Sequence, residues 1–311
     1  MDGKRLRRQL RHMLNEESGS NYLDSFTSYD LLNQAAMRLN ERITHLVDSE
    51  DLTTVADQSF YDLRPDFMRL VDADHLGRDA IRWNDGSAFH RIPRNDFEHE
   101  WHNREYSETS IAVPDSFSIT PEDSPEDLET GNSTTSAGAA VAGKCNLIDS
   151  TATFSTTDSI FPGDTVHNTT DGSMGVIISI TSDTTLTTAL FDGTDNDWSS
   201  SDNYIIQPQA RYKLRLNPPT SASGDTITYR YLRRPQPVYS DYDHFNFPLQ
   251  FQDALVYYAV GLYKMRSQMI GEAATWFQQA EALVKVHQKS QMKALDKQRV
   301  IVNFKKKQRN Y

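Results

Sequence analysis

The chain has 311 residues, and its composition of 37% hydrophobic and 24% charged residues is typical of soluble globular proteins. At about 100 to 200 residues per domain, this length predicts roughly two domains. A formal net charge of −11 argues against a protein that wraps nucleic acid, because that function needs a continuous basic face. No stretch approaches the ~18 apolar residues of a membrane span, so we expect a protein that is made in the cytoplasm and does not enter a membrane.

Positive charge gathers at both ends of the chain, whereas the middle is acidic. Residues 1–20 and 299–311 are expected to be basic tails, which are usually solvated and less often bind an anionic partner. The basic residues of the N-terminal arm are Lys4, Arg5, Arg7, Arg8 and Arg11. No acid occurs in the C-terminal tail.

The first clear element in chain order is an amphipathic helix from Ser28 to about Val47. Apolar side chains recur there every three or four residues, and Ser28 is available as its N-cap. Residues 51–118 then predict short strands, with a break at Arg64-Pro65 because proline cannot donate to a sheet. A β-hairpin is expected around residues 84–86, where Asp-Gly suits a tight turn.

The middle of the chain predicts a linker followed by a separate β module. Residues 114–143 are rich in proline, acids and small residues, which is typical of a loop-like linker. The following Thr-, Ser-, Val- and Ile-rich sequence predicts short strands separated by turns such as Asp171-Gly172 and Asp192-Gly193. We therefore expect residues 128–208 to form an inserted small all-β barrel or sandwich that projects as a peripheral decoration.

The last third predicts strands and then helices. Residues 211–231 contain two alternating runs around a turn, which predict a hairpin, and the sequence after Pro248 predicts a helical hairpin with a break near Gly271. Its apolar seam includes Leu255, Tyr258, Leu262, Trp276, Phe277 and Leu283. The predicted class is α+β: a helical core, made of the N-terminal helix and this hairpin, with antiparallel strands and the inserted module. The core would be discontinuous, residues 1–127 and 209–311.

No motif in the sequence points to catalysis, a metal or a cofactor. Phosphate-loop motifs are absent, and His99 and His102 lack the i, i+4 spacing of a helical zinc site. Cys145 has no arguable base partner, so packing is favoured over a nucleophilic role. Four acids are expected to form a solvated loop rather than a carboxylate pair or calcium site: Glu122, Asp123, Glu126 and Asp127. We expect a structural protein, and a hydrolase built on residues 98–105 ranks last among the alternatives.

Three segments resemble the head-to-tail connector (adaptor) proteins of tailed bacteriophages. They are DLLNQAAMRLNE, FYDLRPDFMRLVDA, and LRLNPP…GDTITYRYLRRP followed by FPLQFQDALVYYAV. The third is the most specific, because it preserves an order of strand, Gly-Asp turn, aromatic-rich strand and helix. Residues from about 130 to 208 depart from the pattern, and Arg64 stands where the family usually has a smaller, uncharged residue.

The resemblance implies a structural protein of the virion neck. Its copies would form a ring, usually of twelve, that docks on the portal protein, extends the DNA channel and receives the tail or nozzle protein. DNA would pass without sequence recognition, and the helical seam would supply the ring interface. The candidates for portal binding are Arg299, Lys305, Lys306, Lys307, Arg309 and Tyr311. The competing class is a tail-side accessory or adhesive protein whose β module binds a surface.

Overall fold

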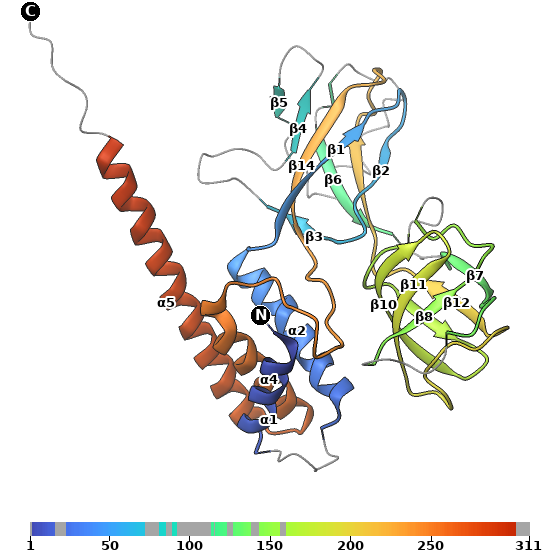
Figure 1. Cartoon of the computed structure of the whole chain (residues 1–311). Coiled ribbons are helices and arrows are strands. Elements are labelled where there is room, and N and C mark those ends of the chain that lie inside the picture. The colour runs from blue at the N-terminus through green and yellow to red at the C-terminus, as the bar shows by residue number, and fades with distance from the viewer. Residues whose placement is uncertain are drawn as a thin grey trace, which may run out of the picture. The chain divides into compact units, whose positions relative to one another are not determined.

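The computed structural model describes residues 2–15, 23–71, 81–84, 89–91, 113–114, 116–122, 127–137, 143–155 and 160–302. Contacts divide the chain into two compact units (Figure 1). The helical unit comprises Met1–His45 and Val238–Tyr311, and the β unit comprises Leu46–Pro237. Among the described residues, no helix combines the length and the apolar character that crossing a membrane requires.

The helical unit is built around one buried helix. Its elements are α1 (Gly3–Met13), α2 (Ser25–Ile43), the short 3-10 helix η1 (Leu249–Phe251), α4 (Gln252–Arg266) and α5 (Ile270–Val302). The helix α4 packs against α1, α2 and α5 (Figure 1). Consecutive residues of α4, Ala254 to Val256 and Tyr258 to Leu262, are buried. Burial on so many successive residues means that α4 is covered on nearly all sides, as expected for a central helix.

Two expectations about the N-terminal region are wrong. The helix α2 begins three residues before Ser28, because Asp24 is the N-cap: its carboxylate accepts a hydrogen bond of 2.6 Å from the Thr27 backbone N–H. The basic N-terminal residues do not form a solvated arm but the helix α1, in which Leu6 and Leu10 are 0% exposed. Leucines four residues apart share one side of a helix, so the basic side chains occupy the remaining sides.

The β unit contains three antiparallel sheets. The five-stranded sheet has the order β1-β14-β4-β5, with β3 also paired to β14; the other orders are β7-β12-β9-β10-β11-β8 and β2-β13-β6. The strands are β1 (Val47–Thr53), β2 (Phe60–Asp62), β3 (Phe67–Leu70), β4 (Ile81–Asn84), β5 (Phe89–Arg91), β6 (Ser116–Pro121), β7 (Glu129–Asn132), β8 (Cys145–Ile148), β9 (Thr165–Asn168), β10 (Ser173–Ser182), β11 (Thr185–Phe191), β12 (Asn203–Gln207), β13 (Tyr212–Asn217) and β14 (Thr226–Arg233).

This architecture contradicts the predicted fold class. The protein is mostly β, with three sheets and a separate helical unit, rather than a helical core that carries strands and a small inserted module. Part of the error lies in residues 114–143, which were expected to be a linker but contribute the strands β6 and β7. The proline, glycine and serine content of this segment hid these strands, because β6 and β7 are completed by hydrogen bonds to β13 and β12, far along the chain.

The expected hairpin within residues 211–231 is also wrong. The strand β13 pairs with β2 and β6, whereas β14 pairs with β1, β3 and β4. Their connecting loop bonds instead to the β1–β2 connection, where the Thr54 N–H donates to Asp225 O at 2.9 Å and the Gly224 N–H donates to Thr54 O at 3.0 Å. Each strand therefore lies inside its own sheet, with a partner on both edges.

Other strand expectations are confirmed. The strands β4 and β5 pair antiparallel, as the hairpin around residues 84–86 predicted, although residues 85–88 lie outside the described part of the chain. Asp171-Gly172 joins β9 to β10, and Gly172 has a φ of 72°, which suits glycine. The β7–β12 strands form one curled sheet around a core that includes Trp198 and Cys145 (Figure 1). Whether residues 128–208 fold as a separate module stays a prediction.

Candidate interaction surface of the helical unit

A loop of the same unit anchors α1 at its first residue. The Gly3 N–H donates to Asp243 O at 3.0 Å, and the Lys4 N–H donates to Asp241 O at 3.3 Å. A Cβ at position 3 would stand 2.8 Å from the Ser240 carbonyl oxygen, so only glycine allows this approach of backbone to backbone. The N-terminal helix is therefore docked tightly on residues 240–243.

Asp241 joins this loop to two helices. Its carboxylate accepts hydrogen bonds from the Tyr29 hydroxyl of α2 and from the Arg7 guanidinium of α1, where the ion pair measures 3.1 Å. The Arg7 guanidinium also lies over the Tyr29 ring, 5.5 Å from its centroid. Burial, followed by the hydrogen bond to Asp241, raises the pKa of Tyr29. These contacts hold α1 and α2 in a fixed relation and leave Lys4, Arg5, Arg8 and His12 on the surface.

The exposed side of α1 is strongly basic. Lys4, Arg5, Arg8 and His12 are exposed, and residues 3–13 contain no acid. A helix that carries several cations and no anion attracts acidic surfaces, and salt weakens that attraction. The basic character expected of the N-terminal arm is thus displayed on a rigid helix rather than on a solvated tail.

The predicted seam residues of the helical hairpin divide into two groups. Leu255, Tyr258 and Leu262 of α4 are buried, with exposures of 0%, 3% and 4%. The α5 members, Trp276, Phe277 and Leu283, are only partly buried. The hairpin itself is confirmed, because the Tyr258 and Phe277 rings lie 6.3 Å apart and α4 packs against α5. A contact between these residues and a neighbouring copy stays a prediction.

Glu281 on α5 ties three helices together. Its carboxylate accepts a hydrogen bond of 2.9 Å from the Tyr258 hydroxyl of α4 and pairs with Arg42 of α2 at 2.8 Å. Burial raises the pKa of Tyr258, and the hydrogen bond to Glu281 raises it further. The α4 residues of the seam therefore belong to the interior of a single chain.

The outer side of α5 is a surface that the sequence reasoning missed. We define the outer face of α5 by the exposed residues on one side of the helix; they are Gly271, Ala274, Thr275, Gln278, Ala282, Lys285 and Val286. At 3.6 residues per turn these positions fall on one side of the helix, and Lys285 is the only charged residue among them. The exposed residues Glu272 and Gln279 flank this face. Val286 is 62% exposed, and Ile270 at the start of the helix is 73% exposed. The available signal was this run of small and apolar residues opposite the seam, within a chain of 24% charged residues.

Most of the predicted portal-binding residues lie outside the described part of the chain. Arg299 belongs to α5, which continues to Val302, whereas Lys305, Lys306, Lys307, Arg309 and Tyr311 are not described. The helix α5 has 33 residues and α4 has 15, so α5 extends well past its partner toward the basic C-terminus (Figure 1). The role of the tail in portal binding stays a prediction.

Only some of the residues considered for catalysis or metal binding lie in the described part of the chain. In the described part of the chain, no group of three or more His, Cys, Asp or Glu side chains is placed to hold a metal ion, and residues 98–105 lie outside it. Cys145 is buried in the core of the six-stranded sheet, and burial raises the pKa of its thiol. Glu122 pairs with Lys213 at 2.9 Å, and Asp127 accepts a hydrogen bond of 3.0 Å from Gln207. Asp123 and Glu126 are not described.

Comparison with known families gives one match. The model of a protein family described as SU10 adaptor protein matches residues 134–300, more than half of the 311 residues. The match begins just after β7 and includes the other five strands of the six-stranded sheet. These strands are therefore part of the family pattern, although residues from about 130 to 208 departed from the connector pattern in the sequence. No curated protein matches the chain.

Proposed function

Because the chain belongs to the SU10 adaptor protein family, and is thus a structural adaptor of a phage particle, we propose that its copies form a closed ring below the portal. The ring would extend the DNA channel and provide the attachment site for the tail, a structural rather than a catalytic role. Its position would be the neck of the virion, and twelve copies is the number that the connector resemblance implies. The portal protein and a tail or nozzle protein would be its partners.

The observation that carries this proposal is the contrast between α4 and the outer face of α5. The apolar residues of α4 are covered by α1, α2 and α5 of the same chain, so a neighbouring copy must use an outer surface. On the outer face of α5, small and apolar residues stay exposed, and helices pack closely where side chains are small. A closed ring needs a heterologous contact of this kind, in which one surface meets a different surface of the next copy.

The distribution of charge also favours the outer face of α5 as the contact between copies. Copies with a net charge of −11 repel one another, and the repulsion is smallest where the contacting surface carries no negative charge. None of the residues that define the outer face of α5 is acidic, and Lys285 is the one charged residue among them. The flanking Glu272 is paired with Lys264 at 3.0 Å. A ring with a net negative charge would also bind DNA phosphates weakly, which suits a channel through which DNA slides.

The test is to place a charge in the middle of this face. Ala282→Glu puts a carboxylate on the outer face of α5, and we expect it to convert rings into monomers, because burying a charge in an interface is costly even with Lys285 nearby. Electron microscopy and native mass spectrometry, with and without the portal protein, would measure ring formation. The charge-matched control is Ser221→Glu, at an exposed position in the β unit, which should leave rings intact.

Two outcomes would count against the proposal. If the unmodified protein stays monomeric even when mixed with portal protein, ring formation itself is wrong. If rings form but Ala282→Glu leaves them unchanged, the ring remains and the assignment of its contact to α5 fails.

A further inference from the structure

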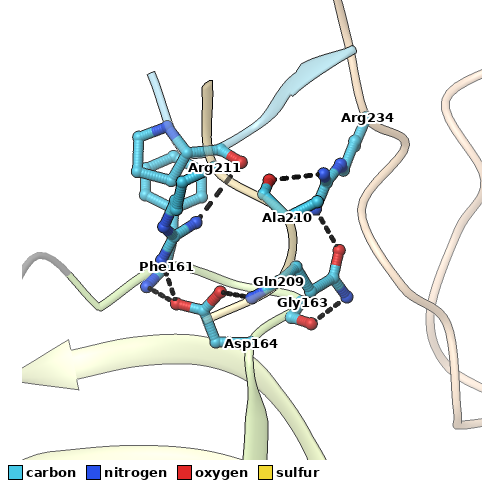
Figure 2. A network of polar contacts seen from close by, with 8 residues as sticks. Phe161, Gly163, Asp164, Gln209, Ala210, Arg211 and Arg234 are labelled. Atoms are coloured by element: carbon cyan, nitrogen blue, oxygen red, sulfur yellow. Dashed lines mark hydrogen bonds and ion pairs between the residues drawn. The ribbon is translucent and has the colours of Figure 1, made fainter. Parts of the chain in front are cut away.

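Asp164 is a buried carboxylate at the end of an interior strand of the six-stranded sheet. It stands in the turn before β9, and its side chain is 2% exposed. One carboxylate oxygen accepts from the Arg211 guanidinium at 2.7 Å and from the Phe161 N–H at 2.8 Å, and the other accepts from the Gln209 N–H at 3.1 Å (Figure 2). Burial raises the pKa of this carboxyl, and Arg211 and the two backbone N–H groups oppose that rise. Asp164 therefore forms a buried ion pair with Arg211 in which both carboxylate oxygens accept hydrogen bonds.

Arg211 carries the contact out of the six-stranded sheet. It lies one residue before β13, a strand of the three-stranded sheet, and its side chain is 10% exposed. Its second terminal nitrogen donates to Pro65 O, in the β2–β3 connection, at 3.4 Å (Figure 2). Nearby, the Arg64 guanidinium lies 5.4 Å from the centroid of the Phe161 ring. The turn before β9 of the six-stranded sheet is thus attached to the β2–β3 connection, which joins the three-stranded sheet to the five-stranded sheet.

Arg234 holds the short segment between β12 and β13. Its guanidinium donates to the Gln209 side-chain oxygen and, at 2.8 Å, to Ala210 O (Figure 2). The Gln209 side-chain amide in turn donates to Gly163 O, beside Asp164. The Arg234 backbone N–H donates to Asp66 O at 2.7 Å, and burial lowers the pKa of its guanidinium. The side chains of Gln209 and Arg234 therefore both form hydrogen bonds that hold the segment between β12 and β13 in place.

We propose that Asp164, Gln209, Arg211 and Arg234 form a polar strap that fixes the six-stranded sheet to the rest of the β unit. If the six-stranded sheet were joined to the rest of the β unit by a flexible linker, residues 208–211 would be solvated. Instead, the Gln209 N–H donates to Asp164 of the six-stranded sheet, and Ala210 O accepts from Arg234. A buried ion pair is weak evidence for stability, but removal of one partner leaves a buried charge without compensation, so the pair favours one geometry. The strap is independent of ring formation and would give every copy of the sheet the same orientation.

Hydrogen exchange of the full-length protein tests the strap. In Asp164→Asn and in Arg211→Met we expect residues 207–212 to exchange about tenfold faster or more, while β11 and β14 keep their protection, because only the connection opens. The double variant should exchange no faster than either single variant, since the two residues act as one pair. Lys213→Met is the matched control, two residues after Arg211. It removes a partly exposed ion pair between Lys213 and Glu122 and should not accelerate exchange of residues 207–212.

Two results would overturn the inference. Unchanged exchange of residues 207–212 in both single variants would mean that the connection does not depend on the ion pair. Uniform acceleration across both sheets would mean that Asp164 and Arg211 support the whole core rather than a local strap. If neither variant folds, Arg234→Met leaves the ion pair intact and removes only the guanidinium that binds Gln209 and Ala210, and it should still accelerate exchange of residues 207–212 selectively.

Discussion

Gly261 of α4 lies against the ring of Phe277 of α5: a Cβ at position 261 would stand 2.6 Å from a ring carbon of Phe277. Alanine would favour the helix at this position, but the clash forces the ring or the helix to move. We expect Gly261→Ala to lower the free energy of unfolding by about 1 kcal/mol, at the lower end of the range for overpacking. Urea unfolding monitored by circular dichroism would measure it.

Gly271 is the matched control for that substitution. It is also a helical glycine, but an added Cβ would meet nothing within 4 Å. Gly271→Ala should therefore raise stability by up to about 0.5 to 1 kcal/mol through helix propensity alone. The same sign of change at both glycines would show that the contact with Phe277 is not the cause.

Alkaline pH should destabilise the β unit through Tyr229. Burial raises the pKa of Tyr229 to about 12, and its side chain is 0% exposed. The unfolded chain releases its tyrosine protons near pH ~10, while folded Tyr229 keeps its proton, so stability is lost as pH rises from about 10 to about 12. The loss should reach roughly 2 kcal/mol for this residue in urea titrations across that range.

Tyr229→Phe checks the assignment. The variant cannot ionise, so its stability should fall less steeply with pH over the same interval. It also lacks the hydroxyl that accepts a 3.0 Å hydrogen bond from the Arg64 N–H, so its stability at neutral pH should be lower. If stability falls with pH as steeply in Tyr229→Phe as in the unmodified protein, other buried tyrosines cause the effect.

The N-cap of α2 predicts a small, specific loss. Asp24→Ala removes the carboxylate that accepts from the Thr27 N–H and should lower the free energy of unfolding by about 1 kcal/mol. Asp24→Asn keeps a side-chain oxygen in place and should retain most of the stability. Equal losses in the two variants would indicate that the charge of Asp24, rather than its capping bond, is what matters.

The basic C-terminal tail predicts a salt-dependent contact with the portal. A chain that ends at Gln298 lacks all the proposed portal-binding residues, and we expect weaker docking, with the difference shrinking as salt rises. Replacing Lys305, Lys306 and Lys307 by glutamine in a full-length chain separates charge from length. Full portal affinity of the truncated chain at every salt concentration would show that the tail is not the contact.

Local elements were largely predictable from the sequence. The apolar periodicity that indicates α2 and the two C-terminal helices is a property of neighbouring residues, and the structure contains all three helices. The turn at Asp171-Gly172 was predictable because glycine tolerates the positive φ that the turn needs. The outer face of α5 was not recognised, since the apolar seam on the other side of the helix dominated the pattern.

The sequence by itself determined the helices α2, α4 and α5, many of the strands and turns, the acidic balance and the resemblance to phage adaptors. The tertiary structure alone decided which strands are neighbours, that α4 is covered within one chain, and that Asp164 meets Arg211 across 47 residues of sequence. Periodicity reports only which side of an element is apolar. The choice of partner for that side depends on the long-range burial and hydrogen bonding of the whole chain, which no local window contains.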